Sequence, residues 1–383
     1  MADNNENKVL NVPHLRFPEF SGEWKKHSLG EIGETIIGLT YKPSDVVDNN
    51  GIIVFRSSNI KNGMIDYSDL VRVNKHIKDK IITKENDILV CARNGSQRLI
   101  GKNAIIKQED ANNTFGAFMM VYRANDNPFI LPLLSTKKYF SQVGENLGAR
   151  INQITTSDFN GFEFYFPENH AERTKIAELF RLLDERIATQ NKIIEDLKKL
   201  KSAISERLFN AIKGDVVVLE DIGDVVKGKQ INGEFLSESG KYYVMKGGIE
   251  PSGFYNDYNV EANTISISEG GNSCGYVQFN ACPFWSGGHC YTIQNTTDNV
   301  KTEYLYQFLK SKESEIMKLR IGSGLPNIQK KDLAKFKITI PNISEQKVIS
   351  AFLSSFERKA DVEMNFVNLL LEEKQYLLRQ MFI

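Results

Sequence analysis

Two long stretches of the chain carry apolar residues at alternating steps of four and three positions, which is the heptad pattern of a coiled-coil helix. The first stretch begins at Ile176 and ends at Leu208, and eight of its ten heptad positions are apolar. A seam of this length, about 50 Å at 1.5 Å per residue, requires a partner helix that covers it. Its predicted seam residues are Ile176, Phe180, Leu183, Ile187, Ile194, Leu197, Ile204 and Leu208.

The second stretch repeats the first at one constant offset in sequence, so that Ile349 corresponds to Ile176. Gln190 and Lys201 interrupt the first seam, and Glu363 and Lys374 interrupt the second at the corresponding positions. Matching interruptions indicate duplication of one ancestral unit, and the simplest arrangement pairs the two helices with each other. The alternative is two helices in separate cores, but both seams are about three times the ~11–12 residues of an average globular helix. The predicted seam residues of the second stretch are Ile349, Leu353, Phe356, Val367, Leu370 and Leu377.

The segments around the helices are repeated as well. Pro167 recurs as Pro341 shortly before the second helix, and "LGEIGETIIGLT" (29–40) matches "LEDIGDVVKGKQ" (219–230). We interpret the glycines shared by these two segments as turn positions. Between the repeats, short alternating runs such as "NDILVCARNG" and "NTISISEG" are typical of β-strands joined by long loops.

These patterns predict an α+β fold with two β-rich modules and a pseudo-twofold internal repeat. A pair of long antiparallel coiled-coil helices is expected to separate the modules. The expected boundaries are 1–168 for an N-terminal arm and the first module, 169–213 for the central spacer helix, 214–342 for the second module and 343–383 for the distal spacer helix.

Polar loops in both modules carry side chains suited to nucleic acid. Arg, Asn and Gln make bidentate contacts with guanine and adenine, whereas Lys and the amides of Gly-rich turns suit phosphates. Taken singly, such loops are more often ordinary protein surface. The candidate DNA-binding residues are Lys42, Arg93, Asn94, Ser96, Gln97, Arg98, Lys102, Arg150, Asn152, Gln153, Lys229, Gln230, Asn272, Ser273, Arg320, Ser323, Asn327, Gln329 and Lys330.

Composition narrows the function classes. The 48 basic and 48 acidic residues cancel, so bulk charge does not drive nucleic-acid binding, although a local basic face remains compatible with it. The polar start "MADNNENKVL" is not a signal peptide, and the chain has no apolar run long enough for a membrane helix, so we expect a cytoplasmic protein. The four cysteines lack the close Cys pair of a zinc site, and we expect no metal.

Two motifs imitate catalytic sites. "GDVVKGKQ" (223–230) begins like a phosphate-binding loop, but Gln230 stands where Ser or Thr must reach magnesium. "WSGGHCYT" (285–292) places His289 beside Cys290, but adjacent side chains on a strand point apart, which disfavours a nucleophile pair. We therefore expect a chain without catalytic residues and without a cofactor of its own.

The repeated organisation resembles the specificity subunit of type I restriction-modification systems. The stretch "VPHLRFPEFSGEWKKHSLGEIGE" (12–34) resembles the entry segment of these subunits, and residues 151–209 and 322–383 resemble their central and distal regions. "GGNSCGYV" (270–277) resembles a recurring turn of the recognition domains. One departure is "ERTKIA", in which Arg173 stands at a position where the family usually has Gln and where the second half keeps Gln346.

The resemblance implies that each module is a target recognition domain that reads one half of a split, asymmetric DNA sequence. It also implies that the helices set the gap between the halves and bind two modification subunits, which bring S-adenosylmethionine and the methyl-transfer chemistry. Two restriction subunits can join this complex. The alternatives are a two-module scaffold that binds proteins through a coiled-coil spacer, and, less compatible with the sequence, a cysteine hydrolase that uses Cys290.

Overall fold

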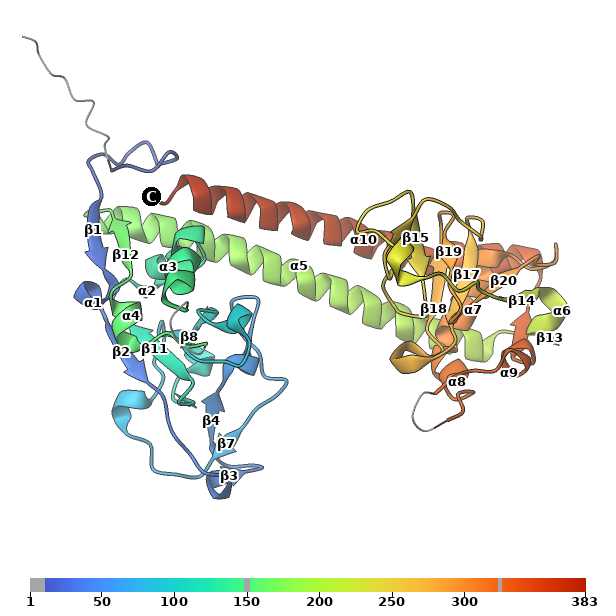
Figure 1. Cartoon of the computed structure of the whole chain (residues 1–383), viewed down its shortest axis with the longest axis horizontal. Helices are drawn as coiled ribbons and strands as arrows, with labels where there is room; N and C mark the ends of the chain where they lie inside the picture. Colours follow the sequence, from blue (N-terminus) through green and yellow to red (C-terminus); the bar gives the residue numbers. More distant parts are fainter. Residues whose placement is uncertain (1–10, 148–151, 323–325) are drawn as a thin grey trace, which may run out of the picture. The chain divides into compact units, whose positions relative to one another are not determined.

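The computed structural model describes residues 11–147, 152–322 and 326–383, and the chain divides into two compact units. Unit 1 consists of Met1–Thr189 and Phe366–Ile383, and unit 2 consists of Gln190–Asn365. Two long helices, α5 (His170–Ala211) and α10 (Ile343–Gln380), each contribute residues to both units (Figure 1). Among the described residues, no helix is both long and apolar enough to cross a membrane.

Unit 1 contains two four-stranded sheets. The first has the order β2 (Glu34–Ile37), β11 (Met119–Arg123), β8 (Ile88–Cys91) and β9 (Asn103–Ile105), and all its neighbouring strands are antiparallel. The second has the order β10 (Thr114–Phe115), β4 (Ile52–Phe55), β7 (Arg72–Val73) and β3 (Val46–Val47). Two further pairs are β1 (Lys25–Ser28) with β12 (Glu163–Phe166), and β5 (Ile60–Lys61) with β6 (Met64–Ile65). The short helices of the unit are α1 (Leu29–Ile32), α2 (Asn127–Leu133), α3 (Lys137–Leu147) and α4 (Thr156–Asn160).

The core of unit 1 includes the last residues of the chain. The Phe382 ring lies 6.3 Å from Trp24, 5.8 Å from Phe129 and 5.7 Å from Phe180, measured between ring centroids. The backbone N–H of Leu15 donates to the carbonyl of Gln380 at 2.9 Å, so the N-terminal segment also lies against the end of α10. The C-terminal end of the chain is therefore part of the core of the first module.

Unit 2 repeats, in its own main sheet, the strand order of the first sheet of unit 1, which is the main sheet of that unit. Its main sheet has the order β14 (Asp224–Lys227), β20 (Cys290–Gln294), β17 (Thr264–Ser268) and β18 (Val277–Asn280). Its second sheet has the order β16 (Phe254–Tyr255), β15 (Tyr242–Met245) and β19 (Trp285–Ser286), and β13 (Asp215–Val218) pairs with β21 (Lys337–Ile340). The short helices are α6 (Leu219–Ile222), α7 (Thr302–Ser311), α8 (Glu313–Met317) and α9 (Lys330–Ala334). The predicted α+β class with two repeated β-rich modules is confirmed.

Close backbone approach, rather than a turn, explains two of the repeated glycines, Gly38 and Gly228. A Cβ atom on Gly38 would lie 2.2 Å from the carbonyl oxygen of Gly116, and one on Gly228 would lie 2.2 Å from that of Gly287. Neither Gly38 nor Gly228 has a positive φ, so no left-handed conformation requires glycine there. The interpretation as turn positions is therefore wrong for Gly38 and Gly228, where two backbones pass too closely for any side chain. The other shared glycines, Gly33 and Gly223, do end the short helices α1 and α6.

Within each unit the two long helices run antiparallel. In unit 1, Phe180 of α5 contacts Phe382 near the end of α10, and Asp184 pairs with Lys374 at 2.5 Å. In unit 2, the Lys201 ammonium lies 2.7 Å from the Glu357 carboxylate. All fourteen predicted seam residues are buried or half-buried, and Ile204, Leu208, Ile349 and Leu353 belong to the apolar core of unit 2.

Candidate nucleic-acid interface

In unit 1, the loop after β8 lies against the segment that precedes α4. Arg93 and Gln153 form an antiparallel β-bridge, and the N–H of Asn94 donates to the carbonyl of Asn152 at 3.3 Å. The Asn152 side chain in turn donates to the carbonyl of Gly95 at 2.9 Å. The two polar stretches of the first module, which are distant in sequence, therefore form one surface. Arg150 lies outside the described residues.

The candidate side chains on this surface differ in how free they are. Arg93, Gln97 and Arg98 are exposed, and the guanidinium of Arg93 lies 5.2 Å from the centre of the Phe118 ring, which is itself 59% exposed. Within the described parts of the chain, the Arg98 side chain has no hydrogen bond or ion pair, so it is free to bind a ligand.

The remaining candidates of the first module are less free or lie elsewhere. Ser96 is exposed, and its N–H donates to the Asn94 side chain at 3.0 Å. Lys102 is half-buried, and its carbonyl accepts from the N–H of Cys91. Lys42 is exposed on a separate loop, where its N–H donates to Asp45, and no hydrogen bond joins it to the other described candidates.

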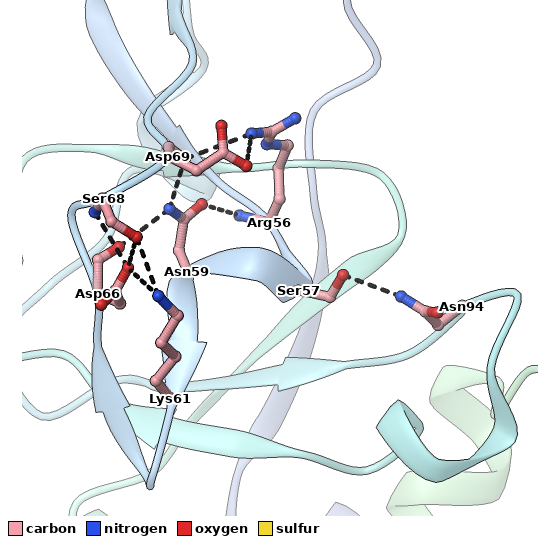
Figure 2. A network of polar contacts seen from close by, with 8 residues as sticks. All are labelled: Arg56, Ser57, Asn59, Lys61, Asp66, Ser68, Asp69 and Asn94. Carbon is pink, nitrogen blue, oxygen red and sulfur yellow. Dashed lines mark hydrogen bonds and ion pairs between the residues drawn. The ribbon is translucent and has the colours of Figure 1, made fainter. Parts of the chain in front are cut away.

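A polar network that the sequence did not indicate supports the Asn94 loop (Figure 2). Asn94 donates to the hydroxyl of Ser57 at 2.9 Å. The neighbouring Asn59 is fully buried; its side chain accepts from the N–H of Arg56 and donates to the carbonyls of Asp66 and Asp69. The Arg56 guanidinium donates to Asp69 at 2.8 Å. These contacts fix the segment from Arg56 to Asp69 beside the exposed Arg93–Arg98 loop.

The carboxylate of Asp66 is an acceptor in the same network. Hydrogen bonds from Ser68 and Lys61 lower the pKa of Asp66 to about 2, so this group remains ionised at neutral pH. Lys61 and Asp66 both lie near the β5–β6 turn, and their ion pair of 3.0 Å closes that turn. Apart from Nε of Arg56, which is buried without a partner in the described structure, the charged and amide groups of the network are already paired, and the role of the network in this loop is support.

Unit 2 has the same arrangement at the equivalent place. Gly270, two residues after the end of β17, forms a β-bridge with Asn327, just before α9. The N–H of Ile328 donates to the carbonyl of Glu269 at 2.8 Å. Asn272 is exposed and Ser273 half-buried in the turn that follows. In both units, the loop after the strand that is third in the order of the main sheet (β8 or β17) therefore pairs with the segment that leads into a short helix (α4 or α9).

The other candidates of the second module surround this pairing or lie beyond it. Arg320, Asn327 and Lys330 are exposed, whereas Gln329 is half-buried at the start of α9. Lys229 and Gln230 are exposed after β14, where the N–H of Lys229 donates to the carbonyl of Ser286 at 2.8 Å. Among the described residues, no hydrogen bond links Lys229 or Gln230 to Asn272 or Ser273. Ser323 lies outside the described residues.

A charged cluster at this surface was missed from the sequence. The buried carboxylate of Glu269 lies 2.6 Å from the Lys227 ammonium, 3.1 Å from the Tyr291 hydroxyl and 3.4 Å from Nδ1 of His289. Burial and the neighbouring Glu269 raise the pKa of Tyr291 to about 12, so the phenol stays protonated and donates its hydrogen bond. In the sequence His289 stands out only as a neighbour of Cys290, and no local signal connects it with Glu269 at the end of a different strand.

The geometry around Cys290 does not support a nucleophile. Cys290 is buried, and its thiol contacts the carbonyl of Tyr291, whereas His289 is largely exposed and faces Glu269. Burial raises the pKa of the Cys290 thiol, which disfavours the thiolate that a hydrolase needs. In the described part of the chain, no group of three or more His, Cys, Asp or Glu residues is placed to hold a metal ion.

The departure at Arg173 preserves a local contact. Arg173 donates to the carbonyl of Pro167 at 2.7 Å and to the Asp126 carboxylate at 2.9 Å. Gln346, at the equivalent place in unit 2, donates to the carbonyl of Pro341 at 2.9 Å. Both side chains therefore tie the start of a long helix to the proline before it, and Arg173 adds an ion pair.

Comparisons with known proteins agree with one another. The family model for the type I restriction modification DNA specificity domain matches residues 21–199 and 213–370. A type I specificity subunit assigned to Mycoplasma pneumoniae is 33% identical over 161 residues, which are 42% of this chain and 42% of that protein. Another, from Mycoplasma genitalium, is 23% identical over 250 residues, or 61% of this chain and 65% of that protein.

These two matches thus span less than two thirds of each relative. Among solved structures, the crystal structure of the type I restriction-modification S subunit from M. genitalium superposes with a TM-score of 0.64 at 21% identity. The superposition covers 97% of this chain and 99% of that one, and at this identity it establishes likeness of fold.

Proposed function

Because the chain belongs to the family of type I restriction-modification DNA specificity domains and carries two copies of the domain, we propose that it is the DNA-specificity subunit of such a complex. Each unit reads one half of a bipartite, asymmetric DNA site. Phosphate contacts position each unit on the duplex, and contacts to base edges specify the sequence. In this role the chain is a non-catalytic subunit that acts in the cytoplasm, where its DNA target lies.

The observation that carries this proposal is the repeated loop pairing. One β-bridge of each unit lies at the same place in the repeated fold: Arg93–Gln153 in unit 1 and Gly270–Asn327 in unit 2. The exposed side chains around the two bridges differ, with Arg93, Gln97 and Arg98 in one unit and Asn272 and Asn327 in the other. An identical frame with different side chains is what two readers of two different half-sites require.

Exposed apolar side chains on the long helices support a scaffolding role. When such side chains gather on one element outside the core seam, they are typical of protein–protein interfaces. Val348 and Leu369 are 68% and 61% exposed. We propose that these positions bind two modification subunits, which bring S-adenosylmethionine, and that two restriction subunits join the complex. The exposed apolar residues of α5 and α10 are Leu182, Ile193, Leu200, Val348, Phe352, Val362, Met364, Leu369, Leu371 and Tyr376.

Co-purification with the cognate modification subunits tests the scaffolding, and native mass spectrometry gives the stoichiometry. We expect two modification subunits per chain, and sequence-selective binding of duplex DNA by the assembly. Val348→Asp and Leu369→Asp should weaken assembly, whereas Lys198→Asp at an exposed polar position of α5 should not. An assembly that forms but binds DNA without sequence preference would instead favour a protein-binding scaffold.

A further inference from the structure

Strand register brings Lys227, Glu269 and His289 to one face of the main sheet of unit 2. Lys227 pairs with Tyr291 across β14 and β20, and Ser268 pairs with Cys290 across β17 and β20. Glu269 directly follows Ser268, and His289 directly precedes Cys290, so these two residues face each other. The N–H of Glu269 donates to the carbonyl of His289 at 2.9 Å. His289 and Tyr291 are separated by a single residue of the chain and therefore share a face. The cluster lies where this face reaches the Gly270–Asn327 bridge.

The three side chains differ sharply in exposure. The Glu269 side chain is 9% exposed, whereas those of Lys227 and His289 are 51% and 69% exposed. Oε1 of Glu269 accepts hydrogen bonds from the Lys227 ammonium and the Tyr291 hydroxyl. Oε2 has no hydrogen-bond partner in the described structure, and Nδ1 of His289 lies 3.4 Å from it. A buried carboxylate is costly unless it is paired. Glu269 therefore acts as a buried anchor for two cationic or polar groups that face solvent.

The shared frame does not require this cluster. The register of unit 1 places Ile37, Ala92 and Phe118 at the positions of Lys227, Glu269 and His289. The same backbone therefore folds with no charge at these three places. Ile37 and Phe118 are themselves 60% and 59% exposed, so in both units these positions project side chains outward from the end of the sheet.

We propose that Lys227 and His289 are specificity-determining residues of unit 2, held by Glu269 as a positioning residue. The inference deepens the proposed function, on which it rests. Lys227 keeps N–H donors beyond the one that binds Glu269, and they suit the O6 and N7 acceptors of guanine. Nδ1 is the nitrogen of His289 that lies beside Glu269, at 3.4 Å, so Nε2 is the nitrogen left for a base. When it carries no proton, Nε2 is an acceptor that suits the N4 amino group of cytosine. Together the two side chains complement one G·C base pair in the major groove.

Methylome sequencing of a host that expresses this chain with its modification subunits tests the proposal. His289→Ala and Lys227→Gln change exposed side chains, and Glu269→Gln keeps the size of the anchor while removing its charge. We expect each variant to relax one G·C position in one half-site, with methylation at the substituted site rising about tenfold or more relative to the cognate site. The other half-site should be unchanged.

Phe118→Ala, at the position equivalent to His289, is the matched control because it lies in unit 1 and should leave the motif of the unit 2 half-site intact. Co-purification with the modification subunits confirms that each variant folds and assembles. An unchanged motif in assembled His289→Ala and Lys227→Gln would overturn the inference. So would a uniform loss of methylation at all sites, which indicates a phosphate contact. If the wild-type chain directed no bipartite methylation, the proposed function would fall, and the inference with it.

Discussion

The side-chain amide of Gln190 donates a hydrogen bond to Oε2 of Glu363. Both residues are buried, and they are two of the four polar interruptions of the heptad seams, at corresponding positions of the repeat. The other two interruptions, Lys201 and Lys374, also find a polar partner on the opposite long helix. Lys201 pairs with Glu357 in unit 2, and Lys374 pairs with Asp184 in unit 1. Asp184 and Glu357 also occupy corresponding positions of the repeat, so the duplicated helices make the same ion pair twice.

Removing one partner of the Gln190–Glu363 pair should destabilise the helices. Glu363→Leu leaves the buried Gln190 amide without an acceptor, and Oε1 of Gln190 has no partner in the described structure. We expect a loss of about 1–3 kcal/mol in the free energy of unfolding, measured by urea denaturation.

The double variant Gln190→Leu/Glu363→Leu is the control for this pair. Replacement of both polar groups by apolar ones is often neutral or stabilising, so the double variant should recover most of the loss. A double variant whose loss equals the sum of the two single losses would show that the pair is not coupled.

Phe382→Ala should destabilise unit 1 although it lies next to the C-terminus. The ring is buried among Trp24, Phe129 and Phe180, and loss of a buried Phe side chain costs about 3–5 kcal/mol. Thermal denaturation measures the effect, with Tyr376→Ala as the control because Tyr376 is 52% exposed on the adjoining helix α10. Equal, small effects of both substitutions would place the chain end outside the core.

Arg98→Ala should alter recognition of one half-site only. Arg98 is exposed on the Arg93–Arg98 loop of unit 1, and a good bidentate contact with a base discriminates by about 1–3 kcal/mol. Sequencing of methylated sites in a strain carrying the variant shows which half relaxes. Uniform loss of methylation at all sites, with normal folding, would assign Arg98 to phosphate binding or assembly.

An insertion of four residues after Lys199 should change the gap between the half-sites. It lengthens the helix by about 6 Å and roughly one turn, so the apolar face of α5 is nearly retained. We expect methylated motifs with the same two halves and an altered number of intervening base pairs. A gap identical to that of the wild-type chain would contradict a role of α5 in setting the spacing.

Features with a short sequence period could be predicted, and contacts between distant residues could not. The heptad positions from Ile176 to Leu208 are visible because each apolar residue recurs within a few positions. The alternating runs around Ile88–Cys91 and Thr264–Ser268 indicated the β-rich class for the same reason. Strand order, by contrast, depends on pairings such as Lys227 with Tyr291, which are far apart in sequence and leave no local pattern.

The candidate site was predictable in type but not in geometry. Polar loops around Asn94 and Asn152 could be singled out by composition, but their meeting required the fold. Nothing in the sequence distinguishes the buried anchor Glu269 from the other acidic residues, 48 in all. Its proposed function depends on Lys227 and His289, which reach it only across the sheet. Phe382 was likewise assigned to the distal spacer segment, since nothing in its neighbourhood indicates that it reaches Trp24.

The central claim is that the two units read two different DNA half-sites, and one measurement tests it most directly. Single-molecule sequencing of methylated bases, in a methylation-free host expressing this chain with its modification subunits, reports every modified site. We predict one bipartite, asymmetric motif with a fixed gap, which disappears when this chain is omitted. Methylation that is absent, lacks sequence preference, or follows a single continuous motif would contradict the account.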